Sequence, residues 1–185
     1  MASHVARHKS VQGATRRRIY LLRHAKSSWD QPLLADHDRP LAPRGRRAIA
    51  RLERHVRKSG LAPQLVVCSS AVRAVQTWEG VRGGLPSGIR VEIADDVYGA
   101  DAITLRRRLE RLSDAVESVV MIGHNPAIEE LATGLAGAGD ELALGRMQTK
   151  FPTGGLATLT FEGAWTELSW GRAVLREFVI PRELR

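Results

Sequence analysis

Two arginines and two histidines stand where short apolar runs of this sequence give way to polar residues. Arg23 and His24 come directly after one such run, and Arg73 comes shortly after a second. His124 and Asn125 follow a third run. Arginine carries a rigid fork of donors that matches phosphate oxygens, and a neutral imidazole is a good nucleophile. This pattern indicates a phosphate pocket with an imidazole nucleophile beside it.

The elements that must position these residues are strands alternating with helices. Short apolar runs predict buried strands at residues 19–22, 64–68 and 118–122, and an alternating pattern predicts a strand at 90–94. Helical spacing and capping residues predict helices at 43–59, 71–81, 102–112 and 125–135, with Ser69 or Ser70 capping the second. Three closing strands are predicted at 156–161, 166–170 and 174–180, after a Gly-rich stretch of undecided structure.

This alternation predicts an α/β sandwich with a mostly parallel sheet. Ligands of such sheets bind at the carboxyl ends of the strands, and the helix N-termini that follow point free N–H groups at anions. We therefore expect the polar junctions after residues 22, 68 and 122 to meet at one edge of the sheet.

Three motifs in this order resemble those of the histidine phosphatase superfamily. They are Leu22-Arg23-His24-Ala25-Lys26, the stretch Ser69–Thr77 around Arg73, and Ile122-Gly123-His124-Asn125-Pro126. The stretch Asp36-His37-Asp38-Arg39-Pro40-Leu41, with little room for an inserted cap, is similar to the SixA type of phosphohistidine phosphatase. The resemblance spans residues 19–180. It implies a phosphoglycerate mutase-like fold, a three-layer α/β/α sandwich without a cap domain.

The resemblance also implies a role for each motif residue. His24 would attack phosphorus through Nε2 and form a covalent phosphohistidine, with its Nδ1–H held by a neighbouring acceptor such as a backbone carbonyl. Arg23, Arg73 and His124 would hold the phosphate oxygens and stabilise the transition state, with Asn125 as a further contact. No cofactor or metal is expected, because the arginines supply the positive charge and the sequence has no HxxEH or HExxH pattern.

The proton donor is left open by the sequence. Ester cleavage needs an acid to protonate the leaving group, and Asp36, Asp38, Asp95 and Asp96 are candidates, with Asp36 slightly favoured. Each could equally be a turn or cap residue. Arg39 is predicted to bind phosphate or an incoming peptide, and an ion pair with Asp36 or Asp38 is the alternative.

Three functions are compatible with these residues. The first is removal of phosphate from phosphohistidine on a protein, which an open site without a clear acid favours, because imidazole is a better leaving group than an alkoxide. The second is hydrolysis of small phosphoesters such as sugar phosphates or nucleotides. The third is a non-catalytic phosphate- or nucleic-acid-binding module, which the intact arginine and histidine motifs oppose.

Length and composition fit one globular domain. The 185 residues are enough for one well-buried core, with 43% apolar and 26% charged residues. No apolar run approaches the roughly 20 residues that span a bilayer, so no membrane partner is expected. The single cysteine, Cys68, excludes an internal disulfide framework, and we expect a cytoplasmic location.

Much of the net charge of +8 is concentrated at the N-terminus. We predict a basic, disordered tail at residues 1–17 and the histidine phosphatase domain at 18–185. Such a tail could attract nucleic acid, but it has no aromatic residue on which bases would stack. The sequence leaves the oligomeric state undecided.

Overall fold

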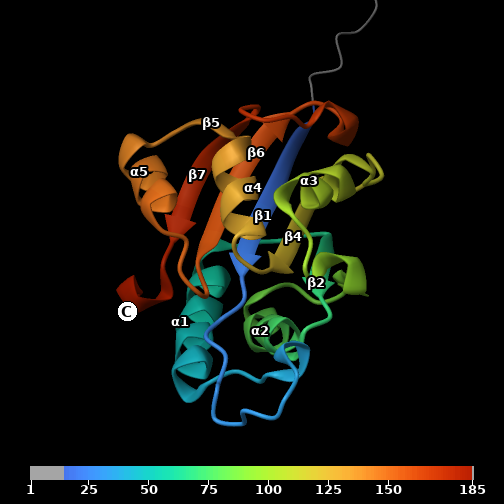
Figure 1. The fold of residues 1–185 in the computed structure, drawn as a ribbon. Helices are drawn as coiled ribbons and strands as arrows, with labels where there is room; N and C mark the ends of the chain where they lie inside the picture. The colour runs from blue at the N-terminus through green and yellow to red at the C-terminus, as the bar shows by residue number, and fades with distance from the viewer. Residues whose placement is uncertain (1–14, 185) are drawn as a thin grey trace, which may run out of the picture.

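The computed structural model describes residues 15–184, in which helices cover both faces of a seven-stranded sheet (Figure 1). The strands are β1 (Arg16–Arg23), β2 (Leu65–Ser69), β3 (Arg90–Ala94), β4 (Ser118–Gly123), β5 (Ala136–Gly139), β6 (Leu156–Glu162) and β7 (Ala173–Val179). The helices are α1 (Pro43–Ser59), α2 (Val72–Val81), α3 (Ala102–Glu110), α4 (Ala127–Leu135) and α5 (Glu141–Thr149). The predicted three-layer α/β/α sandwich is confirmed, and the described residues form no cap domain.

The sheet has the strand order β3-β2-β4-β1-β6-β7-β5 and is parallel in its first half. β3, β2, β4 and β1 run parallel, because a helix crosses over between successive strands of this group. β6 pairs antiparallel with both β1 and β7, and the short segment around Trp165–Glu167 connects it to β7. The edge strand β5 pairs parallel with β7. The parallel half therefore carries four carboxyl ends side by side, among them those of β1, β2 and β4, which the three motifs follow.

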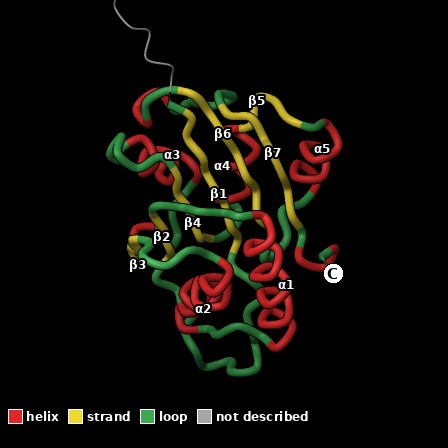
Figure 2. The backbone as a smooth tube through the Cα atoms, turned by 180° about the vertical axis from the view of Figure 1, so that it is seen from behind, coloured by secondary structure: helices red, strands yellow, loops and turns green. Residues whose placement is uncertain are grey.

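Two apolar cores lie on opposite faces of this sheet. α3, α4 and α5 pack on one face, and α1 and α2 cover the other, as the reverse view shows (Figure 2). β1 serves both cores, because Ile19 and Leu21 point to the first and Tyr20 and Leu22 to the second. The central strands are consequently buried on both sides.

α1 has the start, the apolar face and the stop that the sequence predicts. Pro43 occupies the first turn, Leu52 and Val56 are buried, and Gly60 ends the helix with φ 66°. The first turn lies against the loop that follows β1, where Gly45 faces the carbonyl oxygen of Lys26 with no room for a Cβ. α1 is thus fixed beside the first motif.

β1 begins at Arg16, two residues before the predicted start of the domain. Arg17 is 3% exposed, and its guanidinium donates to the carbonyl oxygens of Asp114 and Val116. These bonds tie the end of the predicted tail into the sheet. Residues 1–14 of that tail lie outside the described part of the chain.

The closing segment differs from the prediction in one element. Residues 166–170 do not form a strand, because the chain makes a 3-10 turn at Trp165–Glu167 that buries Trp165 and directs its indole N–H to the carbonyl of Val116. The undecided Gly-rich stretch forms β5 and α5. No helix among residues 15–184 is long and apolar enough to cross a membrane.

Candidate active site

The three predicted polar junctions meet at one edge of the sheet. Arg23 at the end of β1 pairs with Gly123 at the end of β4, and Cys68 near the end of β2 pairs with Ile122. The backbone N–H of His24 continues this pattern by donating to the carbonyl of Gly123 at 3.0 Å. The parallel register therefore brings the first and third motifs side by side.

His24 is held in one neutral form by its surroundings. The ring is in a residue only 8% exposed, and its Nδ1 lies 2.7 Å from the carbonyl oxygen of Ala25. A carbonyl only accepts, so Nδ1 carries the proton and Nε2 presents its lone pair to the site. Burial is the main cause that lowers the pKa of His24 to about 3, with help from the nearby His124, Arg73 and Arg23 and against the bond to Ala25.

Arg73 joins the two histidines. Its Nε donates to Nε2 of His24 at 3.3 Å, and its Nη2 lies 3.4 Å from Nδ1 of His124. The two rings have centroids 4.9 Å apart. One guanidinium from α2 thus spans both imidazoles, although Arg73 and His24 are 49 residues apart in the sequence.

His124 is held on its other side by Ser69. Nε2 of the ring donates to the Ser69 hydroxyl at 2.8 Å, because Nδ1 faces a guanidinium that can only donate. Burial and then the charge of Arg73 lower the pKa of His124 to about 4, against an opposing effect of Asp36. The predicted capping role of Ser69 and Ser70 is wrong, since α2 has Ala71 at its N-cap with no side-chain cap bond.

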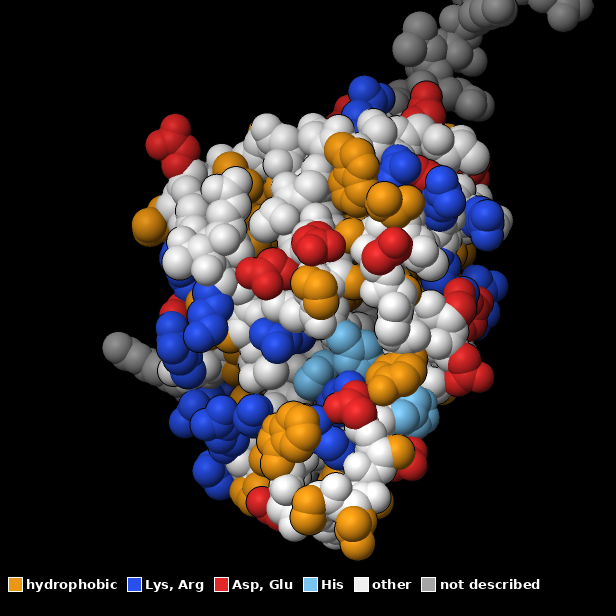
Figure 3. All heavy atoms as spheres, in the orientation of Figure 1, with side chains coloured by type: hydrophobic (Ala, Val, Ile, Leu, Met, Phe, Trp, Pro, Cys, Tyr) orange, Lys and Arg blue, Asp and Glu red, His pale blue; other side chains and the backbone are white. Residues whose placement is uncertain are grey.

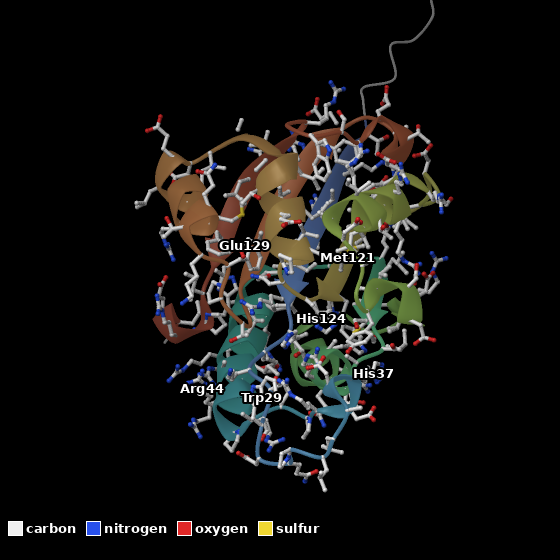
Figure 4. The ribbon with its side chains drawn as sticks, in the orientation of Figure 1. Trp29, His37, Arg44, Met121, His124 and Glu129 are labelled. Carbon is white, nitrogen blue, oxygen red and sulfur yellow. The ribbon has the colours of Figure 1, made fainter. Side chains whose placement is uncertain are left out.

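Arg23 is held by the segment between α5 and β6. Its Nη1 donates to the carbonyl of Phe151 at 2.7 Å, and the Nδ2 of Asn125 donates to the same oxygen at 3.1 Å. Glu129 accepts from Asn125 Nδ2 and from the N–H of Phe151 (Figure 4). Burial lowers the pKa of Arg23, and the charge of Glu129 opposes this shift. Arg23 Nε and Asn125 Oδ1 are buried without a partner among the described residues.

The loop before β6 clamps the backbone of the first motif. The N–H of Gly154 donates to the carbonyl oxygens of Arg23 and His24 at 3.0 and 3.1 Å, and the N–H of Arg23 donates to Gly155. Gly154 adopts φ 77°, a conformation that glycine reaches without strain. These hydrogen bonds fix the backbone of Arg23 and His24 at the point where β1 ends.

Asp36 contacts Arg73, the arginine that also contacts both histidines. Its carboxylate accepts from Arg73 Nη2 and Arg39 Nη1, each at 2.8 Å, and from the Tyr98 hydroxyl at 2.9 Å. The pKa of Asp36 is lowered: although desolvation, the largest influence, acts to raise it, the bonds to Tyr98 and Arg73 and the charge of Arg39 together outweigh it. This carboxyl is therefore held ionised, which opposes the predicted role of Asp36 as proton donor.

Arg39 is turned away from the phosphate position. It is 7% exposed, and its guanidinium donates to the Ser28 carbonyl, the Ser27 hydroxyl and Asp36. Its plane also stacks on the ring of Trp29, with the guanidinium carbon 3.4 Å from the ring centroid. Every guanidinium nitrogen is thus engaged, so the structure favours the ion pair with Asp36 over the predicted phosphate contact.

The other candidate acids are engaged elsewhere. Asp96 pairs with Arg108 on α3, and Asp38 accepts from Nδ1 of His37 at 3.0 Å. Asp95 begins the 3-10 turn Asp95–Val97 that follows β3.

Sequence reasoning missed several side chains that line or support the site. His37 bonds Ser70 through Nε2 and packs edge-on against Tyr98, which in turn packs against His124. Tyr98 is 62 residues from Asp36, and no local pattern predicts their contact. Glu129 lies on α4, four residues after Asn125, which precedes the helix, so the i, i+4 rule for helix surfaces does not reveal this contact.

Comparisons with known proteins find a family model and relatives that this chain matches. The model of the histidine phosphatase superfamily (branch 1) matches residues 19–102. An uncharacterized protein of Mycobacterium leprae is 36% identical over 165 residues, which are 87% of this chain and all of the relative.

Two solved structures of proteins named SixA, both candidate phosphohistidine phosphatases, share the fold. The protein of Nakamurella multipartitia is 27% identical with a TM-score of 0.76, and the match covers 91% of this chain and 98% of that one. The protein of Agrobacterium tumefaciens is 30% identical with a TM-score of 0.72, over 89% and 98%. The chain therefore belongs to the histidine phosphatase superfamily, and within it this hydrolase is of the SixA type.

Proposed function

We propose that this phosphatase removes phosphate from phosphohistidine on a protein, through a covalent phosphohistidine at His24. The single observation that carries the proposal is the state of Asp36. Within the described part of the chain, Asp36 is the carboxylate in contact with Arg73, and three donors hold it ionised. A site without a ready acid suits an imidazole leaving group better than an alkoxide.

The first step uses the lone pair of His24. Nε2 attacks phosphorus while Nδ1–H remains bonded to the carbonyl of Ala25, so the ring needs no proton transfer to become a nucleophile. The substrate ring carries a proton on the nitrogen that is not bonded to phosphorus, so when the N–P bond breaks the electron pair leaves with a neutral imidazole. Water then attacks the phosphohistidine at position 24 and releases inorganic phosphate, which restores neutral His24.

Arg73 and Arg23 supply positive charge to the phosphoryl group. Nε and Nη2 of Arg73 point to ring nitrogens of His24 and His124. A phosphate bound between these histidines would accept hydrogen bonds from the same two groups. The unpartnered Nε of Arg23 is a further donor for such a group. Contacts with Phe151, Glu129 and Asp36 hold the donor groups of the site in position, so these groups need little rearrangement when the transition state forms.

The accessibility of the site supports a protein substrate. Histidine side chains are visible on the surface in a hollow, and no additional layer covers them (Figure 3). A phosphorylated side chain on another protein can reach such a site directly. The solved relatives that carry the SixA name support the same substrate class. We propose a cytoplasmic location as well.

The test compares wild type with His24→Ala on a phosphohistidine protein and on p-nitrophenyl phosphate, in EDTA. We expect wild type to release phosphate much faster from the first, and the variant to be inactive on both. Cleavage of the small ester alone would leave the nucleophile intact and favour the small-phosphoester function. Equal activity of variant and wild type would show that His24 is not the nucleophile.

A further inference from the structure

One side of α1 carries an uninterrupted row of positive charges. Arg44, Arg47, Arg51, Arg54 and Lys58 are all exposed, and their spacing of three and four residues places them along one side of the helix. The row spans 15 residues, and its two ends lie about 21 Å apart at the rise of an α-helix. None of the five forms an ion pair with an acidic residue of the described chain (residues 15–184).

Cations in several other elements of the molecule are paired. On α3, Arg106 pairs with Glu110, and Arg108 pairs with Asp96. On α5, Arg146 pairs with Glu183. Exposed like charges at this spacing repel one another and cost helix stability. The row on α1 is thus a local excess of charge that the fold itself does not neutralise.

The row begins next to the loop that follows His24. Gly45, next to Arg44, packs on the carbonyl of Lys26, and the N–H of Ala42 donates to the same oxygen at 2.8 Å. Lys26 is two residues after His24. In the view of Figure 4, Trp29 lies between Arg44 and His124. The surface in the same orientation shows Lys and Arg side chains beside apolar ones and histidines (Figure 3).

Exposed apolar side chains stand in the loop that connects the first motif to α1. Trp29 is 68% exposed, Leu33 100% and Leu34 36%, all in the loop between β1 and α1. Arg39 stacks on the ring of Trp29 and so holds it in place. Exposed apolar groups rimmed by charge are typical of protein interfaces, in which tryptophan is a frequent anchor.

We propose that Trp29, Leu33, Leu34 and the row on α1 form a docking face for an acidic, partly apolar surface of the phosphorylated protein. The inference rests on the proposed function and names the chemistry of its substrate. The apolar side of α1 is buried against the sheet, so this helix is not free to lie in a membrane interface. Because the start of α1 packs against the loop that follows His24, a partner bound to this face is placed to present its phosphate to His24.

The test uses two synthetic peptides of about 15 residues, long enough in extended form to span the row. Both carry one central phosphohistidine, flanked by Asp and Glu in the first and by Ser and Gln in the second. The variant is R47E/R51E/R54E. Its matched control is R107E/R111E/R172E, which makes the same charge change at exposed positions outside α1.

We expect wild type at low salt to favour the acidic peptide in kcat/KM by about tenfold or more, and added salt to reduce this preference. The α1 variant should lose the preference through a higher KM at unchanged kcat, and the control should keep it. Both should cleave p-nitrophenyl phosphate like wild type. Leu33→Ser should raise KM for both peptides independently of salt, without loss of folding, because Leu33 is fully exposed.

The docking proposal and the proposed function fail differently. Equal cleavage of the two peptides by wild type, or equal loss in the α1 variant and its control, would overturn the docking face and leave the phosphohistidine activity standing. Cleavage of neither peptide, with p-nitrophenyl phosphate still hydrolysed, would overturn both. Binding of duplex DNA or phosphatidylserine vesicles that depends on the row, without any peptide preference, would assign the face to those partners instead.

Discussion

His24 is an imidazole that must stay neutral among positive charges. Burial disfavours its protonated form, and Arg73 and Arg23 disfavour it further, while the carbonyl of Ala25 fixes the proton on Nδ1. The nucleophilic lone pair is thus present across the physiological pH range. The same arrangement has a cost in stability at low pH.

The pKa of His24 is about 3 in the native protein, against an ordinary value of 6.5. Below pH 6.5 the unfolded chain binds a proton that the native state excludes, so stability falls as pH falls from 6.5 toward 3. At about pH 5 the loss from His24 is about 2 kcal/mol.

Urea unfolding at about pH 7 and pH 5 measures this loss. Wild type should lose more free energy of unfolding between the two values than His24→Asn, whose side chain does not titrate. Changes at the carboxylates are common to both proteins and cancel in the comparison. Equal losses would mean that His24 is protonated in the native state at pH 5.

Asp36 distinguishes a positioning role from acid catalysis. Its carboxylate bonds Arg73, Arg39 and Tyr98, so Asp36→Asn should misplace Arg73 and lower kcat by about tenfold. The loss should be the same for phenyl phosphate and p-nitrophenyl phosphate, because positioning does not depend on the leaving group. A proton donor would matter far more for phenyl phosphate, whose leaving group is poorer.

The control for this prediction is Asp38→Asn in the same loop. Asp38 contacts His37 and not Arg73, so a smaller effect is expected. A loss confined to phenyl phosphate in Asp36→Asn would restore Asp36 as the general acid.

At the scale of elements, the sequence predicted what depends on local pattern. The apolar runs located β1, β2 and β4, and the rule for parallel sheets then placed Arg23, His24 and His124 together. The roles of Ser69 and Asp36 were beyond such rules. The Ser69 hydroxyl accepts a hydrogen bond from His124, which is 55 residues away in the sequence. Only the folded structure shows that Asp36, and not Asp38, contacts Arg73.

The contact between α1 and the first motif gives a prediction at this scale. Alanine normally favours a helix over glycine by about 1 kcal/mol. In Gly45→Ala, however, the new Cβ would overlap the carbonyl oxygen of Lys26 and push α1 away from the loop of His24. We expect a loss of about 1–3 kcal/mol in the free energy of unfolding, together with reduced activity.

Gly145→Ala in α5 is the matched control. A Cβ there meets no atom within 4 Å, so the variant should gain about 0.5–1 kcal/mol. Chemical denaturation of both variants measures the two effects. A gain in Gly45→Ala would show that α1 and the loop can separate without cost.

At the scale of the whole molecule, the sheet couples two cores that share no helix. β1, β2 and β4 contribute alternate side chains to both, so neither core can lose its packing without exposing the strands of the other. The sequence predicted the layers from strand and helix alternation. It predicted closing strands without their direction, because no local pattern shows that β6 pairs antiparallel with β1 and β7. One of these strands, at 166–170, is a turn instead.

Two buried tryptophans can report the two cores separately. Trp78 on α2 lies in one core and Trp165 before β7 in the other, 8% and 0% exposed. In a variant that keeps only one of them, with phenylalanine at the remaining tryptophan positions, fluorescence follows one layer while far-ultraviolet circular dichroism follows the whole chain. Because the sheet is shared, both signals should give the same urea midpoint in each variant, as two-state unfolding requires. A fluorescence midpoint below the dichroism midpoint for Trp78 alone would show that α1 and α2 detach first, and that Arg73 leaves the site before the sheet unfolds.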